Sequence, residues 1–342
     1  MADKKVRVAI NGFGRIGRAA FKIGLSKSEI EFVAINDLGS PKVLATLLQF
    51  DTAYGKFDKN ISSDEKNIIV EGKNIPVLAE KEPAKLPWKD LNVDVVIEST
   101  GRFVKDGAAR AHIEAGAKRV VLSAPAKGGD IKTYLLGVNQ DKYSTEEVVS
   151  NASCTTNCIS PVINVLHSKF GVVKALMDTV HSYTAEQNLV DGPPPGGHAD
   201  DMRRARAAAQ NIVPTTTGAA IAVSEVIPEL QGVFDGVAIR VPTLTGSLSN
   251  IVAVLKKTVT VEEINNAFKE AAEHPFYKGI LIANEDPIVS SDIVGSTASA
   301  IVDLPFTRVV GGDLVSVLAW YDNEWGYSNR LVEQVINVGQ SV

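Results

Sequence analysis

The first forty residues alternate between short apolar runs and a glycine-rich turn. Lys5–Ile10 has the alternating pattern of a strand, and Asn11–Gly17 is rich in glycine. Ala19–Leu25 has the spacing of a helix, and Glu31–Asp37 reads as a second strand that ends in an acid. This order predicts a βαβ unit.

The same rhythm continues to residue 150. Short apolar runs lie at Val93–Glu98, Arg119–Ser123 and Val148–Ser150, and Asp106–Ala115 between the first two is compatible with a helix. Strands that alternate with helices form largely parallel sheets. The pattern therefore predicts an α/β fold whose N-terminal part is a Rossmann-type, doubly wound parallel sheet.

After Cys154 the apolar runs become longer and alternate, as the strands of an antiparallel sheet do. These runs are Val172–Tyr183, Val233–Val241, Leu248–Val259 and Leu314–Tyr321. The change of pattern predicts a second, α+β domain with a mainly antiparallel sheet. We place the boundary so that residues 1–153 form the first domain and residues 154–322 the second.

Two helices are expected between the strands of the second domain. They are Thr215–Leu230 and Val261–Glu273, and Thr260 with Glu263 has the spacing of a capping box at the start of the latter. Gly192–Asp201 is strongly biased to proline and glycine and predicts a loop. The chain closes with an amphipathic stretch at Leu331–Val338.

Composition is that of an ordinary soluble globular protein. The 342 residues are 45% hydrophobic and 22% charged, with a net charge of −5. The acidic balance and the lack of a dense Lys/Arg run argue against a nucleic-acid partner. We expect neither a membrane segment nor a cleaved leader, and therefore a cytoplasmic protein. In a reducing compartment a structural disulfide is rare.

Gly12, Gly14 and Gly17 follow the first strand in the pattern G-x-G-x-x-G. The pattern alone is weak, because it also fits a plain tight turn between a strand and a helix. Its context favours a dinucleotide site: a strand precedes it, a helix follows, and Asp37 ends the next strand twenty residues after Gly17. The helix start would hold the pyrophosphate, and Asp37 would accept hydrogen bonds from the adenosine ribose. Because the Asp37 charge would repel a 2′-phosphate, NAD is favoured over NADP.

The segment SCTTNC holds both cysteines, Cys154 and Cys158. With no second Cys pair and no closely spaced His pair, they are too few for a zinc site, so we expect no metal. On a helix, residues four apart rise about 6 Å along the axis, which is poor geometry for a disulfide. Both cysteines could be inert buried thiols. For Cys154 the polar neighbours and the strand-to-helix junction favour a nucleophile whose pKa is lowered by helix N–H groups, although Pro161 could instead mark the helix start.

A thiolate nucleophile needs a base within hydrogen-bonding reach. Three of the five histidines, His112, His167 and His274, fall in or beside predicted helices, and His198 falls in the Pro/Gly loop. His181 lies on a predicted strand and faces away from its apolar neighbours. It is either the base or a histidine satisfied within the sheet.

At these residues the sequence resembles the phosphorylating glyceraldehyde-3-phosphate dehydrogenases. The matching segments run in order along the chain: INGFGRIGR, NDL, STGRF, SAPAK, SNASCTTNC, HSYT, RRARAAAQNIVPTTTGAA, AIRVPT and WYDNEWGYSNR. The resemblance implies oxidation of D-glyceraldehyde 3-phosphate to 1,3-bisphosphoglycerate, a step of glycolysis and gluconeogenesis, with NAD and inorganic phosphate. Cys154 would form a thiohemiacetal and then a thioester, with His181 as base.

The resemblance also implies the residues that hold the ligands. Thr184 and Arg240 match the substrate-phosphate site, and the inorganic-phosphate side is matched by Ser153, Thr155, Arg204, Thr217 and Gly218. Arginine offers a bidentate fork to phosphate, although Arg204 taken alone could be a solvated helix charge. The cofactor contacts are matched by Arg15, Ile16, Ser99, Thr100, Ser123 and Asn323.

The resemblance further implies a homotetramer, and a C-terminal helix, residues 323–342, that completes the NAD-binding domain. Gly192–Asp201 departs from the family pattern, because it is a few residues longer than the usual segment. Two rival interpretations stay open: a sister enzyme using erythrose 4-phosphate or NADP, and an NAD-binding redox sensor in which Cys154 is oxidised reversibly.

Overall fold

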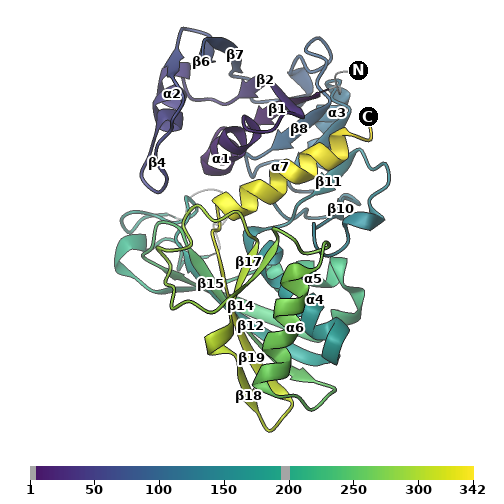
Figure 1. The fold of residues 1–342 in the computed structure, drawn as a ribbon. Coiled ribbons are helices and arrows are strands. Elements are labelled where there is room, and N and C mark those ends of the chain that lie inside the picture. The colour runs from purple at the N-terminus through teal and green to yellow at the C-terminus, as the bar shows by residue number, and fades with distance from the viewer. Residues whose placement is uncertain (1–4, 194–200) are drawn as a thin grey trace. The chain divides into compact units, whose positions relative to one another are not determined.

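The computed structural model describes residues 5–193 and 201–342, so His198 and most of the Pro/Gly loop lie outside the described residues. The chain divides into two compact units (Figure 1). The first comprises the residues up to Leu135, Asn139–Ala152 and Ser328–Val342. The second comprises Leu136–Val138 and Ser153–Tyr327.

The described residues of the first unit form a nine-stranded sheet. In spatial order its strands are β10 (Lys132–Thr133), β11 (Val148–Ser150), β9 (Arg119–Leu122), β8 (Val95–Glu98), β1 (Val6–Asn11), β2 (Ile30–Asn36), β7 (Lys73–Leu78), β6 (Asn67–Val70) and β5 (Ile61–Ser63). The strands from β10 to β7 pair in parallel, and β7, β6 and β5 pair antiparallel. The Rossmann-type sheet predicted from the sequence is therefore confirmed, with an antiparallel extension.

The chain order reverses around β1, which lies between β2 and β8. The carboxyl ends of β1, β2 and β8 thus meet at the point where open α/β sheets bind their ligands. Trp88 is fully buried in the core beneath this edge, in one cluster with Ala9, Val96 and Leu122. The topology fixes where a cofactor can bind.

Helices complete the first unit. They are α1 (Arg15–Gly24), α2 (Pro41–Gln49), α3 (Ala111–Glu114) and α7 (Trp325–Gly339), and a small hairpin joins β3 (Phe50–Asp51) to β4 (Gly55–Lys56). The helix expected at Asp106–Ala115 is only a 3₁₀ turn followed by the four residues of α3. The positive φ of Asp106 and Gly107, 50° and 75°, prevents an earlier start. The C-terminal half of α7 packs on this unit, with Gly339 against Val6 (Figure 1).

The second unit is built on a mainly antiparallel sheet, as predicted. Its strands in order are β13 (Val213–Thr216), β14 (Phe234–Val241), β12 (Val172–Ser182), β15 (Ser247–Leu255), β19 (Leu314–Tyr321), β17 (Ala300–Asp303) and β16 (Leu281–Asn284), with β18 (Arg308–Val310) paired to β19. Among the described strands of this sheet, β12 pairs in parallel with β14 and β16 with β17, and the other pairs are antiparallel. The helices are α4 (Cys154–Phe170), α5 (Ala219–Val226) and α6 (Val261–Glu273).

One strand of this sheet shows how alternation sorts side chains between its two faces. On β12, Thr179 and His181 are buried, whereas Leu176 is 62% exposed and Val180 is 39% exposed. Met177, which is also buried, belongs to the first set. Side chains two residues apart on a strand share a face, so His181 points to the face that α4 covers. The apolar side chains Leu176 and Val180 point the other way.

Of the two helices predicted in the second unit, α6 is confirmed and α5 is shorter than predicted. The capping box of α6 is present: the Thr260 hydroxyl accepts from the Glu263 N–H, and the Glu263 carboxylate accepts from the Thr260 N–H. The helix expected at Thr215–Leu230 starts four residues later, because Thr215 and Thr216 complete β13. β-Branched threonines are favoured in strands, and these two residues pair with β14 instead of forming the first turn of the helix.

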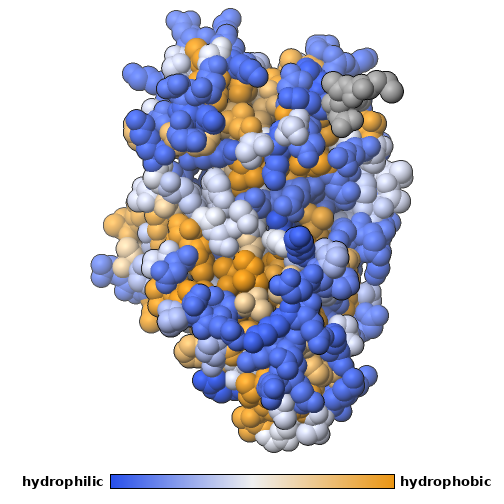
Figure 2. Space-filling view, in the orientation of Figure 1, coloured by the Kyte–Doolittle hydropathy of each residue, from blue (hydrophilic) through white to orange (hydrophobic). Residues whose placement is uncertain are grey.

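Polar residues cover much of the visible surface, with apolar surface over parts of both units (Figure 2). No helix among residues 5–193 and 201–342 is long and apolar enough to cross a membrane.

Candidate active site

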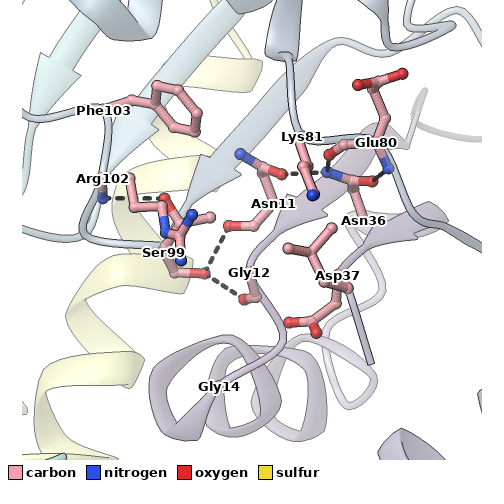
Figure 3. A pocket seen from close by; sticks show the side chains of 12 residues that line it. Asn11, Gly12, Gly14, Asn36, Asp37, Glu80, Lys81, Ser99, Arg102 and Phe103 are labelled. Carbon is pink, nitrogen blue, oxygen red and sulfur yellow. Dashed lines mark hydrogen bonds between the residues drawn. The ribbon is translucent and has the colours of Figure 1, made fainter. Parts of the chain in front are cut away.

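A cavity of about 320 Å³ opens at the carboxyl edge of the parallel sheet (Figure 3). Its lining includes five residues singled out from the sequence: Gly12, Gly14, Asp37, Ser99 and Thr100. They follow the carboxyl ends of β1, β2 and β8; β1 and β2 are consecutive in the chain, and β8 comes about sixty residues later. The cavity therefore lies where the topology predicts a dinucleotide.

The glycines of the turn have distinct physical roles. Gly12 has φ 94°, and a Cβ there would meet the Thr100 backbone nitrogen at 2.7 Å. A Cβ on Gly17 would meet the Gly12 carbonyl oxygen at 2.2 Å, so the first turn of α1 packs directly on the loop. A Cβ on Gly14 would meet no protein atom within 4 Å. Gly14 precedes α1 without a side-chain cap, which leaves helix N–H groups available to an anion.

Asp37 holds the loops on either side of the cavity. Its Oδ2 accepts from the Phe13 N–H at 2.7 Å, and its Oδ1 accepts from the Gly39 N–H at 2.8 Å. Each carboxylate oxygen has a second lone pair, which is free to accept a ribose hydroxyl. Asp37 thus organises the glycine-rich turn as well as facing the cavity (Figure 3).

Arg15, Ile16, Gly17 and Ser123 are not part of the cavity lining. Arg15 opens α1, where its Nη1 forms an ion pair with Asp51 at 2.9 Å and its guanidinium lies over the Tyr54 ring. Ser123 follows β9, with its N–H donating to the Glu98 carbonyl. Sequence reasoning missed seven lining residues, Asn11, Asn36, Leu38, Glu80, Lys81, Arg102 and Phe103. The sequence could have indicated Asn11 and Asn36, because each is a polar residue at the end of an apolar strand.

Cys154 and His181 meet in the second unit. Cys154 is the first residue of α4, and His181 is next to last in β12; Cys154 Sγ lies 3.4 Å from His181 Nε2. Helix α4 starts at Cys154 with Ser153 as its cap, whose hydroxyl accepts from the Thr156 N–H. Pro161 lies inside the helix, so the alternative in which it marks the helix start is wrong.

The hydrogen bonds of His181 fix its tautomer. His181 Nδ1 lies 2.6 Å from the Ser182 carbonyl oxygen, which can only accept, so Nδ1 carries the proton. Nε2 therefore presents its lone pair to the Cys154 thiol. The ring also packs edge-on against Tyr321, whose hydroxyl lies between those of Thr155 and Thr179. The imidazole is held as an acceptor aimed at sulfur.

Burial dominates the protonation of both groups. It raises the pKa of the Cys154 thiol to about 11, while the Arg240 charge and hydrogen bonds with Thr155 oppose it. Burial lowers the pKa of His181 to about 3, and the Arg240 charge acts in the same direction. Backbone hydrogen bonds at the helix start lower the pKa of the thiol, as the sequence suggested, but burial outweighs them and the net shift is upward. Both shifts favour a neutral thiol beside a neutral imidazole, whose Nε2 lone pair faces the thiol.

Cys158 is a buried free thiol one turn further along α4. Its Sγ contacts the Ala319 carbonyl oxygen at 3.8 Å, and burial strongly raises its pKa. The two sulfurs form no disulfide. Cys158 is thus a packed thiol, and only Cys154 has a base beside it.

Arg240 lies beside this pair on β14. Its Nη1 donates to the Ser182 carbonyl at 3.2 Å and to the Thr184 hydroxyl at 3.1 Å. The same Ser182 carbonyl therefore orients His181 and Arg240. Arg240 Nε is buried and has no hydrogen-bond partner among the described residues. A partly buried guanidinium with spare donors is suited to an anion.

The other phosphate candidates lie in the same unit. Arg204 is buried and forms ion pairs with Glu186 and Asp201, and its Nε also reaches the Thr215 hydroxyl. The Thr217 hydroxyl accepts from the Ala219 N–H at the start of α5, which Gly218 precedes. Arg204 is therefore already balanced by two carboxylates, which its position in RRAR did not reveal.

Hydrogen bonds fix the orientation of the Asn323 side-chain amide. Its Oδ1 accepts from the Gly246 N–H at 3.1 Å, the Ser247 hydroxyl at 2.9 Å and the Thr245 hydroxyl at 3.4 Å. Three donors on the oxygen leave the amide nitrogen as the group that Asn323 can offer to a ligand.

A dinucleotide-type cavity in one unit and a thiol–imidazole pair in the other define a cofactor-dependent oxidoreductase that works through a cysteine. Comparison with known proteins gives the same class. Residues 6–106 match the family model described as the NAD-binding domain of glyceraldehyde 3-phosphate dehydrogenase. Residues 153–323 match the model of the C-terminal domain of the same family.

Curated relatives match along nearly the whole chain. A glyceraldehyde-3-phosphate dehydrogenase of Streptomyces coelicolor is 53% identical over 340 residues, which is 98% of this chain and 99% of the relative. One of Geobacillus stearothermophilus is 52% identical over 330 residues, 96% of each chain. The chain belongs to the glyceraldehyde 3-phosphate dehydrogenase family. It is an NAD-dependent enzyme, and its reaction is the oxidative phosphorylation of glyceraldehyde 3-phosphate.

The glycine-rich turn yields a paired prediction. Gly12→Ala should lower the free energy of unfolding by about 1–3 kcal/mol, because it adds a side chain at positive φ and against the backbone. Gly14→Ala should leave stability within about 0.5 kcal/mol, since its Cβ meets nothing in the protein. It should nevertheless weaken NAD binding about tenfold, because the pyrophosphate approaches that backbone. Urea unfolding and NAD titration measure the two effects, and a destabilised Gly14→Ala with normal NAD affinity would contradict the assignment.

Proposed function

We propose that Cys154 is the nucleophile and His181 the base in the oxidation of D-glyceraldehyde 3-phosphate to 1,3-bisphosphoglycerate. The observation that carries this proposal is the 3.4 Å contact between Sγ and an imidazole nitrogen that has a free lone pair. As sulfur attacks the aldehyde carbon, His181 Nε2 takes the thiol proton and passes it to the former carbonyl oxygen. The product of this step is a thiohemiacetal.

Oxidation then converts the thiohemiacetal into a thioester. Bound NAD would supply the hydride acceptor for this oxidation, and His181 Nε2 takes the hydroxyl proton of the thiohemiacetal. Inorganic phosphate attacks the thioester carbonyl, and the bond from carbon to Cys154 Sγ breaks. The acyl phosphate departs, and the thiolate is protonated again.

Two anion sites serve this chemistry. Arg240 and Thr184 bind the phosphate of the substrate, supported by their mutual hydrogen bond and by the unpartnered Arg240 Nε among the described residues. The inorganic phosphate is bound by Ser153, Thr155, Arg204, Thr217 and Gly218. Arg204 would then exchange at least one of its carboxylate partners for phosphate, since both occupy its donors.

NAD binds along the carboxyl edge of the parallel sheet. The groups that contact it are Gly12, Gly14, Arg15, Ile16, Gly17, Asp37, Ser99, Thr100, Ser123 and Asn323. The amide nitrogen of Asn323 donates to the nicotinamide carboxamide, in keeping with the three donors that hold its oxygen. The functional domains are residues 1–153, completed by residues 323–342, and residues 154–322.

The enzyme acts in the cytoplasm as a homotetramer and needs neither nucleic acid nor membrane. Support for self-association comes from the sheet face of the second unit that carries Leu176, Val180 and Val237. These apolar side chains are 62%, 39% and 47% exposed on neighbouring strands. Such a surface is suited to a second copy of the chain.

A matched pair of substitutions tests the nucleophile. Cys154→Ser should abolish NADH formation from glyceraldehyde 3-phosphate, whereas Cys158→Ser should keep most of it, because only Cys154 has a base in contact. Turnover should require inorganic phosphate or arsenate. Many turnovers without either anion would contradict the phosphorylating mechanism, and activity retained in Cys154→Ser would contradict the nucleophile.

The role of His181 has a pH signature. In the wild type, Nε2 can accept the thiol proton at any pH well above about 3, so alkylation of Cys154 by iodoacetamide should vary little between pH 6 and 9. In His181→Asn only preformed thiolate reacts, and burial raises the pKa of the thiol. Its alkylation rate should therefore rise about tenfold per pH unit, and kcat should fall by about 10²–10⁴. A pH-independent rate in His181→Asn would rule His181 out as the base.

The exposed sheet face can be tested by sedimentation velocity. Leu176→Asp should shift the enzyme from tetramers toward smaller species, because it places a charge within an apolar contact. Ile221→Asp is the control, because Ile221 is as exposed as Leu176, at 63%, but lies on helix α5 and not on this sheet face. Tetramers in both variants would exclude this face as the interface.

A further inference from the structure

A buried carboxylate lies directly beneath the cofactor cavity. Glu98 is the last residue of β8 and is 2% exposed. In the sheet it stands opposite Asn11, the last residue of β1, and Asn11 stands opposite Asn36, the last residue of β2. Three polar side chains thus end three neighbouring parallel strands, and nothing in the proposed chemistry uses Glu98.

Glu98 accepts four hydrogen bonds. Its Oε1 accepts from the Thr100 N–H at 2.9 Å and from the Thr100 hydroxyl at 2.5 Å. Its Oε2 accepts from Asn11 Nδ2 at 2.5 Å and from His112 Nε2 at 2.9 Å. A carboxylate, which only accepts, is the group that four converging donors require.

The direction of the His112 hydrogen bond is set from the other side of the ring. Trp88 Nε1, which can only donate, lies 2.9 Å from His112 Nδ1. Nδ1 is therefore the acceptor, and the proton is on Nε2, which donates to Glu98. Trp88 and His112 are fully buried. Glu98 is thus held from below by a rigid pair that does not line the cavity.

Because Glu98 only accepts hydrogen bonds, it determines how the neighbouring side-chain amides are oriented along the cavity floor. Because Glu98 can only accept, Asn11 must turn its amide nitrogen toward it and its oxygen toward Asn36, whose Nδ2 donates at 2.7 Å. Asn36 Nδ2 also donates to the Glu80 carbonyl, so its oxygen accepts from the Glu80 N–H (Figure 3). Each amide orientation follows from the one before it.

We propose that Glu98 is a positioning residue for the cofactor, which fixes the hydrogen-bond polarity of the cavity floor from Thr100 to the Glu80 loop. The proposal rests on the proposed cofactor site. Besides Thr100, three residues of this series of hydrogen bonds line the same cavity: Asn11, Asn36 and Glu80. Two of the three residues that donate to Glu98, Thr100 and Asn11, lie at this cavity, an arrangement that a carboxylate stabilising only the core would not need.

Asp94 provides a matched comparison on the same strand. It immediately precedes β8, as Glu98 ends it, and is also 2% exposed. It accepts from the Arg7 N–H at 2.9 Å and from Lys118 Nζ at 2.7 Å. Asp94 is not among the residues that line the cofactor cavity.

The test compares Glu98→Gln with Asp94→Asn in the full-length enzyme. Glu98→Gln keeps the side-chain shape but directs an NH₂ group at hydrogen-bond donors. The side-chain amides of Asn11 and Asn36 must then flip, or their hydrogen bonds are lost. We expect the Kd and KM for NAD to rise at least tenfold, with kcat at saturating NAD and the KM for glyceraldehyde 3-phosphate within about threefold of wild type. Asp94→Asn should lower the melting temperature but leave the Kd for NAD within twofold.

Two outcomes would overturn the proposal: Glu98→Gln that binds NAD like wild type, or equal losses of NAD affinity in both variants. Should Glu98→Gln fail to fold, His112→Leu and His112→Gln replace it. His112→Leu removes one donor to Glu98 and should raise the Kd for NAD several-fold, whereas His112→Gln can still donate and should restore most of the affinity. Failure of the wild-type enzyme to bind NAD would instead refute the cofactor site itself.

Discussion

The contact between Cys154 and His181 is the interaction on which the proposed chemistry depends. It joins the first residue of α4 to the end of β12, and it forms only because α4 covers the sheet face toward which His181 points. The Ser182 carbonyl makes the contact productive, since it takes the Nδ1 proton and leaves Nε2 free. The same carbonyl also accepts from Arg240, so the proposed base and the proposed anion site are positioned by one group.

Fixed acceptors play the same part in both units. In the second unit a peptide carbonyl orients an imidazole and a guanidinium, and in the first unit the Glu98 carboxylate accepts from Thr100, Asn11 and His112. In each case the accepting group is buried; Thr100 and Asn11 line the cavity at the sheet edge, whereas His112 does not. A buried acceptor is costly to leave unpaired, so it holds its donors in one arrangement before any ligand arrives.

Sequence patterns predicted the elements well where one local signal acted without competition. β12 and β19 alternate regularly, and the capping box of α6 fixed its start. The prediction was wrong where tertiary pairing decided, as at Thr215 and Thr216, which a neighbouring strand draws into the sheet. The antiparallel strands β5 (Ile61–Ser63) and β6 (Asn67–Val70) were not predicted, because segments of three and four residues are too short to show a pattern and are defined by their pairing.

By itself the sequence determined the parts: a glycine-rich turn followed by Asp37, a thiol at a strand-to-helix junction, and a histidine on a strand. These features are local, so the sequence alone shows them, and the family and its reaction were predicted from the resemblance of segments along the whole chain. Only the tertiary structure decided how the parts are charged and oriented. Burial raised the pKa of Cys154, two carboxylates paired with Arg204, and Glu98 met Asn11. Burial and hydrogen-bond partners come from residues far apart in the chain, which no local pattern records.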